Sequence, residues 1–249
     1  MKISVVTAVR NGARTIPDAI QSLRSQTYSD VEHIVQDGGS QDGTLAYLSD
    51  NAHPQMSLLS EPDNGIYDAI NRGIARASGD VIGLLHADDM LADPTILEKV
   101  ASAMCDPQID GVYGDLQYVT HSETARIVRH WQAGQYDRRK LGRGWMPPHP
   151  TLYLRRSVFE RYGVYDPTYR ISGDYDAMLR YLVQGNLRLA YLPHVMVQMR
   201  LGGASNRSWR QLIRKSQEDY RAIKQHQVGG IGTLLAKNLS KLPQFFTHP

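Results

Sequence analysis

The 249-residue chain has a single cysteine, Cys105, and no long hydrophobic run. One thiol cannot form an internal disulfide or a multi-cysteine zinc site, which excludes a disulfide-stabilised scaffold and agrees with a reducing compartment. No stretch approaches the ~20 apolar residues of a membrane span, and the N-terminus has no signal-peptide pattern. We therefore expect a cytoplasmic protein that does not cross the membrane.

The chain also lacks a large excess of positive or negative charge. The net charge is +3, which gives no reason to expect a nucleic-acid partner. Basic residues nevertheless gather in two places: residues 200–249 hold nine Lys and Arg against Glu218 and Asp219, and residues 126–143 hold six against Asp137. Such blocks are usually solvated faces, although they also suggest an anionic surface or substrate.

The motifs of several common enzyme classes are absent. No Gly-x-Gly-x-x-Gly follows the first predicted strand, and there is no P-loop lysine motif. A dinucleotide dehydrogenase and a P-loop kinase are therefore disfavoured. No Gly-x-Ser-x-Gly nucleophile elbow occurs either. If the protein binds phosphate groups, other residues must hold them.

The first half of the chain alternates short apolar segments with amphipathic ones. Predicted strands, rich in β-branched residues, cover 3–9, 31–36, 56–60 and 80–85. Predicted helices with an apolar stripe cover 16–23, a short stretch from Thr44, 66–77 and 96–104. This order predicts an α/β fold with a mostly parallel sheet and helices on both faces.

Past residue 110 the alternation ends. Strands are predicted at 111–119, 124–130 and 187–197, and a helix at 175–184. Residues 131–150, rich in Gly, Pro and Arg, are predicted to form a mobile loop that donor binding orders. Since no sharp linker is visible, we expect both halves to share one core.

Acidic residues follow three of the four early strands: Asp37 follows the second, Asp63 the third, and Asp88 and Asp89 the fourth. Ligands of such sheets bind beyond the carboxyl ends of the strands. Adjacent carboxylates there can hold a hard divalent cation, or they simply open a turn. Asp37 can accept a hydrogen bond from a base or ribose, or close an Asx turn.

Three further sites have a chemical and a structural interpretation. The Asn64-Gly65 pair permits a positive φ and close backbone approach, or forms an ordinary turn. Asp174 opens a predicted helix as a candidate general base or as a plain N-cap. His149, between two prolines, is a ligand or acceptor contact, or part of a structural loop.

Together, four segments resemble the inverting family-2 glycosyltransferases: residues 3–11, 35–44, 63–73 and 79–89. The resemblance extends over about residues 1–202. It implies the GT-A (nucleotide-diphospho-sugar transferase) fold, a mostly parallel central sheet flanked by helices with a C-terminal helical tail. It also implies a nucleotide-sugar donor and a divalent cation, Mn²⁺ or Mg²⁺.

Carried over by position, the resemblance assigns seven residues to the nucleotide-sugar: Thr7, Val9, Asp37, Asn64, Gly65, Asn71 and Asp88. Asp37 would lie near the base, and Asp89, with Asp88, would hold the metal. His86 stands where many members have an aspartate, which leaves the metal preference open.

Asp174 matches the family's catalytic aspartate, although Gly173 precedes it where Glu is usual. The segments around His149, at 148–151, and at 202–205 resemble a subgroup that builds bacterial surface polysaccharides, lipopolysaccharide and glycolipids. His149 would contact the acceptor or a loop.

The implied function is inverting, metal-dependent transfer of a hexosyl or related sugar, with a UDP-sugar favoured, to a hydroxyl of a saccharide or polyprenyl-linked acceptor. A sugar nucleotidyltransferase and a non-catalytic nucleotide-sugar-binding protein are the alternatives. The expected division is a donor half at 1–120, an acceptor half of the same domain at 121–220, and a tail at 221–249.

The tail carries apolar residues at helical spacing: Ile231, Leu234, Leu235, Leu239 and Leu242. Lys237 and Lys241 lie among them. This pattern is typical of an interfacial helix on anionic lipid, here the inner face of the cell membrane. It equally fits a helix packed on its own protein or on the partner of a homodimer.

Overall fold

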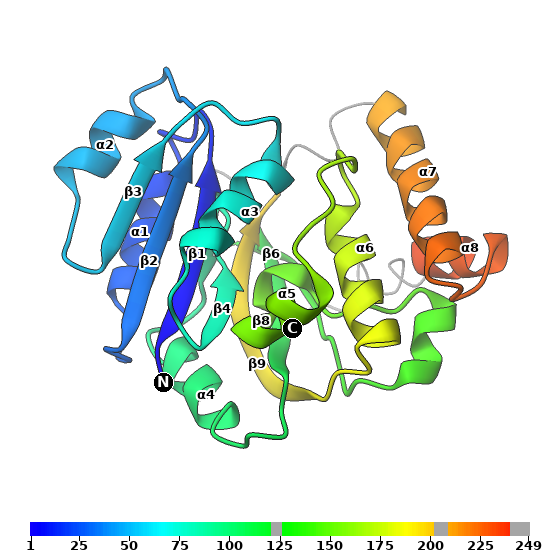
Figure 1. The fold of residues 1–249 in the computed structure, drawn as a ribbon. Coiled ribbons are helices and arrows are strands. Elements are labelled where there is room, and N and C mark those ends of the chain that lie inside the picture. The colour runs from blue at the N-terminus through cyan, green and yellow to red at the C-terminus, as the bar shows by residue number, and fades with distance from the viewer. Residues whose placement is uncertain (121–125, 202–208, 240–249) are drawn as a thin grey trace.

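The computed structural model describes residues 1–120, 126–201 and 209–239, and Figure 1 shows their arrangement. The strands are β1 Ile3–Val9, β2 Val31–Asp37, β3 Met56–Ser60, β4 Val81–Leu84, β5 Asp89–Leu91, β6 Gly111–Val119, β7 Ile127–Trp131, β8 Tyr153–Arg155 and β9 Leu189–Arg200. The α-helices are α1 Ile16–Arg24, α2 Thr44–Asp50, α3 Ile66–Arg76, α4 Ile96–Ala103, α5 Arg156–Tyr162, α6 Gly173–Leu179, α7 Trp209–Gln225 and α8 Ile231–Leu239. Short 3₁₀ turns lie at Arg138–Arg143 and His149–Thr151, and a π-turn at Arg180–Gln184 extends α6.

Within the described residues, one sheet holds nine strands in the order β3-β2-β1-β4-β8-β6-β9-β5, with β7 beside β6. Strands β1 to β4 pair in parallel, as does β6 with β9. Strand β8 runs antiparallel between β4 and β6 and joins the early strands to the later ones. The predicted α/β fold with a mostly parallel sheet is confirmed.

Helices cover both faces of the sheet because alternate side chains of each strand point to opposite sides. On β1, Val6 and Ala8 belong to the core under α3, whereas Val5 and Val9 belong to the core under α1 and α4. Gly73 lets α3 approach β1 closely, since a Cβ there would overlap Val6. The early strands match the prediction within about a residue at each end.

Strand β5 departs from the prediction that Asp88 and Asp89 simply follow a strand. Asp89 begins this three-residue strand, which pairs antiparallel with β9 and sets Asp89 opposite Met199. A strand this short has too few residues to show an alternating pattern.

Residues 131–150 form a loop with short 3₁₀ turns, and this loop packs against the core; its mobility and its ordering by a donor stay predictions. The Trp145 ring packs against Tyr113 and Tyr136, and its indole nitrogen donates to the carbonyl of Ala133 at 3.1 Å. Leu141 is buried in the same core. Aromatic contacts with distant segments therefore hold this loop against the core.

Helices α7 and α8 lie at the end of the molecule opposite α2 (Figure 1). The predicted helix at the tail is present as α8, but its buried residues are Thr233 and Lys237, and Ile231, Leu235 and Leu239 are exposed. Lys241 and Leu242 lie outside the described residues. None of the helices in the described part of the chain is long and apolar enough to span a bilayer.

Candidate active site

Asp37, at the end of β2, is completely buried and holds its own loop together. Its carboxylate accepts hydrogen bonds from the amides of Gly39 (3.1 Å) and Ser40 (3.0 Å), from the Ser40 hydroxyl, and from the Ser60 hydroxyl at 2.6 Å. Burial raises the pKa of this carboxyl, but the hydrogen bonds outweigh it and the net pKa is lowered. Asp37 therefore forms an Asx turn, as one of the two interpretations predicted. A contact between Asp37 and a nucleotide base stays a prediction.

The side chains of Thr7 and Asn71 make contacts inside the protein. Thr7 is buried, with its hydroxyl 3.0 Å from His33 Nε2. The Asn71 amide donates to the Tyr165 carbonyl (2.7 Å) and accepts from the Tyr165 amide (3.0 Å). Val9, also buried, lies beside the end of β2. Their roles toward a nucleotide stay predictions, and for Asn71 the structure adds a clear second role in holding Tyr165.

The Asn64-Gly65 turn lies at the start of α3. Gly65 has a φ of +125°, and its amide donates to the Asp63 carboxylate at 2.9 Å. The exposed Asn64 donates its amide to Asp68 Oδ2 at 2.9 Å and accepts from Arg170 Nη1 at 2.8 Å through its carbonyl. The turn is thus tied to the segment that leads to Asp174.

Asp88 and Asp89 differ sharply in exposure. Asp88 is partly exposed, whereas Asp89 is fully buried and neither of its oxygens has a hydrogen-bond partner among the described residues. Burial and the Asp88 charge raise the pKa of Asp89 well above its usual value; the backbone amide of Arg200, too far or too bent for a normal hydrogen bond, and the Arg200 charge oppose this rise only weakly. An unpaired buried carboxylate is costly, and a bound cation would relieve that cost.

These two carboxylates suit a hard cation, which prefers oxygen ligands. In the described segments no group of three or more His, Cys, Asp or Glu side chains is placed to hold a metal ion. The described residues therefore offer only part of a ligand set for a cation. A donor diphosphate can supply further oxygen ligands.

Asp174 lies in the first turn of α6 and is partly exposed. The Tyr67 hydroxyl from α3 donates to the Ile171 carbonyl at 2.6 Å and lies 3.3 Å from the Asp174 amide and 3.4 Å from its Oδ1. The same Oδ1 accepts from the Tyr175 amide at 2.8 Å. The carboxylate is thus held through Oδ1 and is partly exposed, and a general base needs such access to its substrate.

Gly173, where the family usually has Glu, is explained by the same tyrosine. A Cβ on Gly173 would lie 2.7 Å from Cε2 of the Tyr67 ring. Real Cβ atoms do not approach a ring so closely, so the ring occupies the space that a side chain at this position would need.

His149 connects Asp174 to the end of β4. It is buried, and its Nε2 lies 2.8 Å from the Tyr165 hydroxyl. The Tyr165 ring stacks on Tyr67 at 5.8 Å between centroids, and the His149 ring lies 5.9 Å from that of His86. Burial lowers the pKa of His149 to about 4, with Asp174 opposing and His86 adding to the shift. The imidazole of His149 is therefore neutral at neutral pH.

Comparison with known proteins identifies the family. The family model described as "Glycosyl transferase family 2" matches residues 4–170. The chain belongs to glycosyl transferase family 2. This family-2 protein is 32% identical over 209 residues to the PGL/p-HBAD biosynthesis glycosyltransferase of Mycobacterium bovis, covering 82% of this chain and 78% of that one. It is 32% identical over 180 residues to an uncharacterized glycosyltransferase of Mycobacterium tuberculosis, covering 72% and 68%.

Solved structures share the fold. S. aureus TarS 1–349 in complex with UDP-GlcNAc matches with a TM-score of 0.68 at 15% identity, covering 92% of this chain and 66% of that one. The mannosyltransferase PcManGT from Pyrobaculum calidifontis, in complex with GDP-Man and Mn²⁺, matches with a TM-score of 0.69 at 18% identity, covering 98% and 73%. The chain spans 39% of the longer TarS chain. The GT-A fold of this family-2 glycosyltransferase is thereby confirmed.

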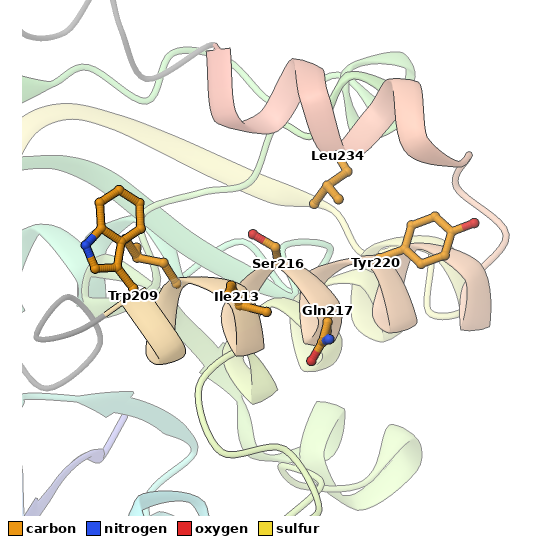
Figure 2. Close-up of a pocket in the computed structure, with 7 residues that line it drawn as sticks. Trp209, Ile213, Ser216, Gln217, Tyr220 and Leu234 are labelled. Carbon is orange, nitrogen blue, oxygen red and sulfur yellow. The ribbon is translucent and has the colours of Figure 1, made fainter.

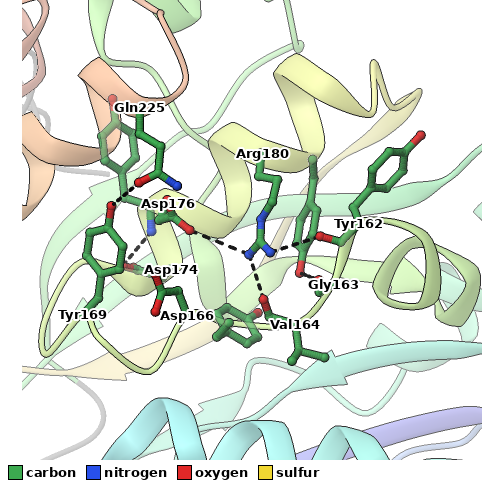
Figure 3. A network of polar contacts seen from close by, with 12 residues as sticks. Tyr162, Gly163, Val164, Asp166, Tyr169, Asp174, Asp176, Arg180 and Gln225 are labelled. Atoms are coloured by element: carbon green, nitrogen blue, oxygen red, sulfur yellow. Dashed lines mark hydrogen bonds and ion pairs between the residues drawn. The ribbon is translucent and has the colours of Figure 1, made fainter.

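The second aspartate of the α6 motif is structural. Asp176 is buried, with its Oδ1 2.9 Å from His226 Nε2 and its Oδ2 3.7 Å from Arg180 Nη2. Arg180 in turn donates to the carbonyls of Tyr162 and Val164 (Figure 3). Of the two carboxylates in this glycosyltransferase motif, only that of Asp174 is open to solvent.

Sequence reasoning missed two residues that hold the Asp174 region of this glycosyltransferase, Tyr165 and Glu218. Tyr165 forms hydrogen bonds with Asn71 and His149, and Glu218 accepts hydrogen bonds from backbone amides before Asp174. Neither lies in a recognisable motif, so no sequence signal points to them. Tyr67 lies inside the 63–73 motif, but the motif alone does not indicate its role. The 202–205 segment lies outside the described residues.

Proposed function

We propose that the protein transfers a sugar, with inversion, from a nucleoside-diphosphate donor to an acceptor hydroxyl. The observation that carries this proposal is a partly exposed Asp174 whose carboxylate contacts Tyr67. From Tyr67 the contacts run through Tyr165 and His149 to the ring of His86, which precedes the carboxylates after β4. TarS with UDP-GlcNAc and PcManGT with GDP-Man support a nucleotide-sugar donor. A UDP-sugar remains our favoured donor.

In the proposed reaction Asp174 takes the proton from the acceptor hydroxyl. The acceptor oxygen then forms its bond to the anomeric carbon while the bond to the diphosphate breaks on the opposite face. The products are the inverted glycoside and the nucleoside diphosphate, and the proton ends on Asp174 before it passes to water. The Asn64-Gly65 turn and the end of β1, at Val9, would line the donor.

Asp89 and Asp88 would hold Mn²⁺ or Mg²⁺. When bound, such a cation offsets negative charge on a diphosphate leaving group. The unpaired buried carboxylate of Asp89 and the Mn²⁺ in the PcManGT complex support this part of the proposal. We expect excess EDTA to abolish turnover and Mn²⁺ or Mg²⁺ to restore it; full turnover in EDTA would contradict the metal requirement.

A glycolipid acceptor is supported by the PGL/p-HBAD biosynthesis relative and by the surface of α7 and α8. An apolar groove of about 430 Å³ lies between these helices, lined by Trp209, Leu212, Ile213, Ser216, Gln217, Tyr220 and Leu234 (Figure 2). Trp209 is 83% exposed, and Arg210 and Arg214 beside it are exposed cations. Apolar side chains flanked by Arg suit an anionic membrane surface, so we propose peripheral contact with the inner membrane face.

Vesicle flotation tests this contact. Ile213→Glu should weaken binding to anionic vesicles, while Leu45→Glu, an equally drastic change on the exposed face of α2, should not. Binding to neither anionic nor zwitterionic vesicles, together with a dimeric mass by light scattering, would favour the homodimer instead.

The products of the reaction separate the proposed function from its alternatives. The full chain is incubated with Mn²⁺, an octyl glycoside acceptor and, in turn, UDP-sugars and GDP-mannose. Free nucleoside diphosphate with a new glycoside is the expected result. Pyrophosphate would indicate a sugar nucleotidyltransferase. Donor-induced thermal stabilisation without either product would indicate a binding protein.

A further inference from the structure

Glu218, on α7, points its carboxylate at the loop that leads into α6. Its Oε2 accepts from the amides of Ile171 at 2.8 Å and Ser172 at 2.9 Å, and the Arg170 amide lies 3.1 and 3.2 Å from the two oxygens. Three consecutive backbone amides therefore converge on one side chain from a different helix.

These amides precede the first turn of α6, where a helix has N–H groups without intrahelical partners. The N-cap of α6 is Ser172, and it makes no side-chain capping bond. Gly173 has no side chain to contribute. Glu218 therefore supplies from α7 an acceptor for the amide of the N-cap, Ser172, and for the two amides before it, and its negative charge suits the positive end of the helix dipole.

The same loop is held from its other side by Tyr67. The Tyr67 hydroxyl binds the carbonyl of Ile171, and Glu218 binds the amide of the same residue. The peptide groups just before Asp174 are thus fixed from two sides, by the hydroxyl of Tyr67 on α3, which donates, and by the carboxylate of Glu218 on α7, which accepts. A loop held by two opposed polar contacts has little freedom to move its carboxylate.

Helix α7 is itself anchored to α6 beside this contact. The neighbouring Asp219 is buried and pairs with Lys215 at 2.9 Å and with Lys237 of α8 at 2.8 Å. Lys237 Nζ lies 3.1 Å from the ring centroid of Tyr175, the residue after Asp174. Glu218 is therefore presented by a helix whose position relative to α6 is set.

We propose that Glu218 is a positioning residue for Asp174: it sets where the carboxylate meets the acceptor hydroxyl without touching the substrate. The proposal rests on the proposed function, in which Asp174 is the base. A displacement of about 1 Å in a reacting group can cost ~10²-fold in rate, so loss of the Glu218 contact should lower kcat more than it weakens donor binding.

The test compares four full-length variants in the octyl glycoside assay with the UDP-sugar that gives the highest turnover. We expect Glu218→Ala to lower kcat about 10–100-fold with the donor KM within about threefold. Glu218→Gln, which keeps an acceptor oxygen, should recover most of the rate. Lys224→Ala, an exposed change on the same helix, should match the wild type. Asp174→Asn reports on the proposed function itself.

Hydrogen exchange gives a readout that does not depend on activity. In Glu218→Ala the amides of residues 170–175 should exchange faster, while those of β1 keep their protection. Unchanged exchange at 170–175 in Glu218→Ala would overturn the positioning role. An unchanged kcat of Glu218→Ala would also overturn it, provided that Asp174→Asn is inactive in the same assay. An active Asp174→Asn would instead overturn the proposed base. Faster exchange throughout the chain and equal losses in kcat and donor affinity would show a merely structural role, which also overturns the proposal.

Discussion

Two aspartates that the sequence predicts to be site residues, Asp37 and Asp174, are held by the protein in opposite ways. Asp37 is sealed inside the protein and bonded by groups two, three and 23 positions away. Asp174 is partly open, and its loop is held by Tyr67 and Glu218, which lie 107 and 46 positions away from the residues they bind. The first carboxylate stabilises a local turn, whereas the second is partly exposed and lies in a loop that distant helices hold in place.

This difference agrees with the roles that we propose for the two carboxylates. Four hydrogen bonds stabilise the ionised form of Asp37 and leave it no capacity to take up a proton near neutral pH. A general base needs a free lone pair and access to the acceptor. The structure therefore shows a stabilising role for Asp37, and the role of Asp174 as the base stays our proposal.

The largest effect is expected at the open carboxylate. Asp174→Asn keeps the shape but removes the base, and general-base catalysis is worth about 10²–10⁴-fold. We expect turnover to fall on that scale while the melting temperature and its rise with UDP and Mn²⁺ stay near those of the wild type. Turnover within a few-fold of the wild type would remove Asp174 from its role.

The sealed carboxylate should behave in the opposite way. Asp37→Ala leaves two amides and two hydroxyls without their acceptor, and hydrogen bonds to a charged group are worth about 1.5–3 kcal/mol each. We expect a loss of about 2–4 kcal/mol in the free energy of unfolding, measured by urea titration. If Asp37→Ala unfolds at the same urea concentration as Asp174→Asn, the contrast between the two residues fails.

The same contrast explains what the sequence could predict. Strands β1 and β3 and the turn after Asp37 depend on local pattern, and their bounds were predicted closely. Strands β5 and β8 have three residues each, too few for a periodic signal. The tail was predicted as an amphipathic helix, but its inward face carries Lys237, because the buried Asp219 of α7 neutralises that charge.

Within the site, the sequence motifs located the acidic positions but not the residues that support them. Tyr165 and Glu218 act through contacts made only after distant segments pack together. The ordering of residues 131–150 has the same origin, since Trp145 meets aromatic rings from other elements. Long-range packing of this kind leaves no local periodicity to read.

Two buried histidines extend the comparison to pH. His149 lies on the Asp174 side and has a pKa of about 4, and His33, beside Thr7, has a pKa of about 3; burial lowers both. In the unfolded chain each would have a pKa near 6.5. As the pH falls below 6.5 the unfolded state takes up the proton first, so stability present at neutral pH is lost progressively toward pH 4.

For His149 this loss amounts to about 2–3 kcal/mol. We expect His149→Gln to show a smaller drop in unfolding free energy between pH 7 and 4.5 than the wild type, measured by urea titration at each pH. His33 remains in both proteins, so the difference between the slopes isolates His149. Parallel slopes would mean that His149 does not stay neutral when folded.

The smallest effect is expected where the loop of Asp174 meets Tyr67. In Gly173→Ala the new Cβ would lie 2.7 Å from the ring, and overpacking of this kind costs about 1–3 kcal/mol. Because the strain arises from one contact, Tyr67→Leu should relieve most of it, and the double variant should be more stable than the sum of the single changes. Tyr67→Leu also removes the hydroxyl from the Ile171 carbonyl, so the double variant should regain stability but not the full rate. Additive losses in unfolding free energy would show that the ring is not what excludes a side chain at Gly173.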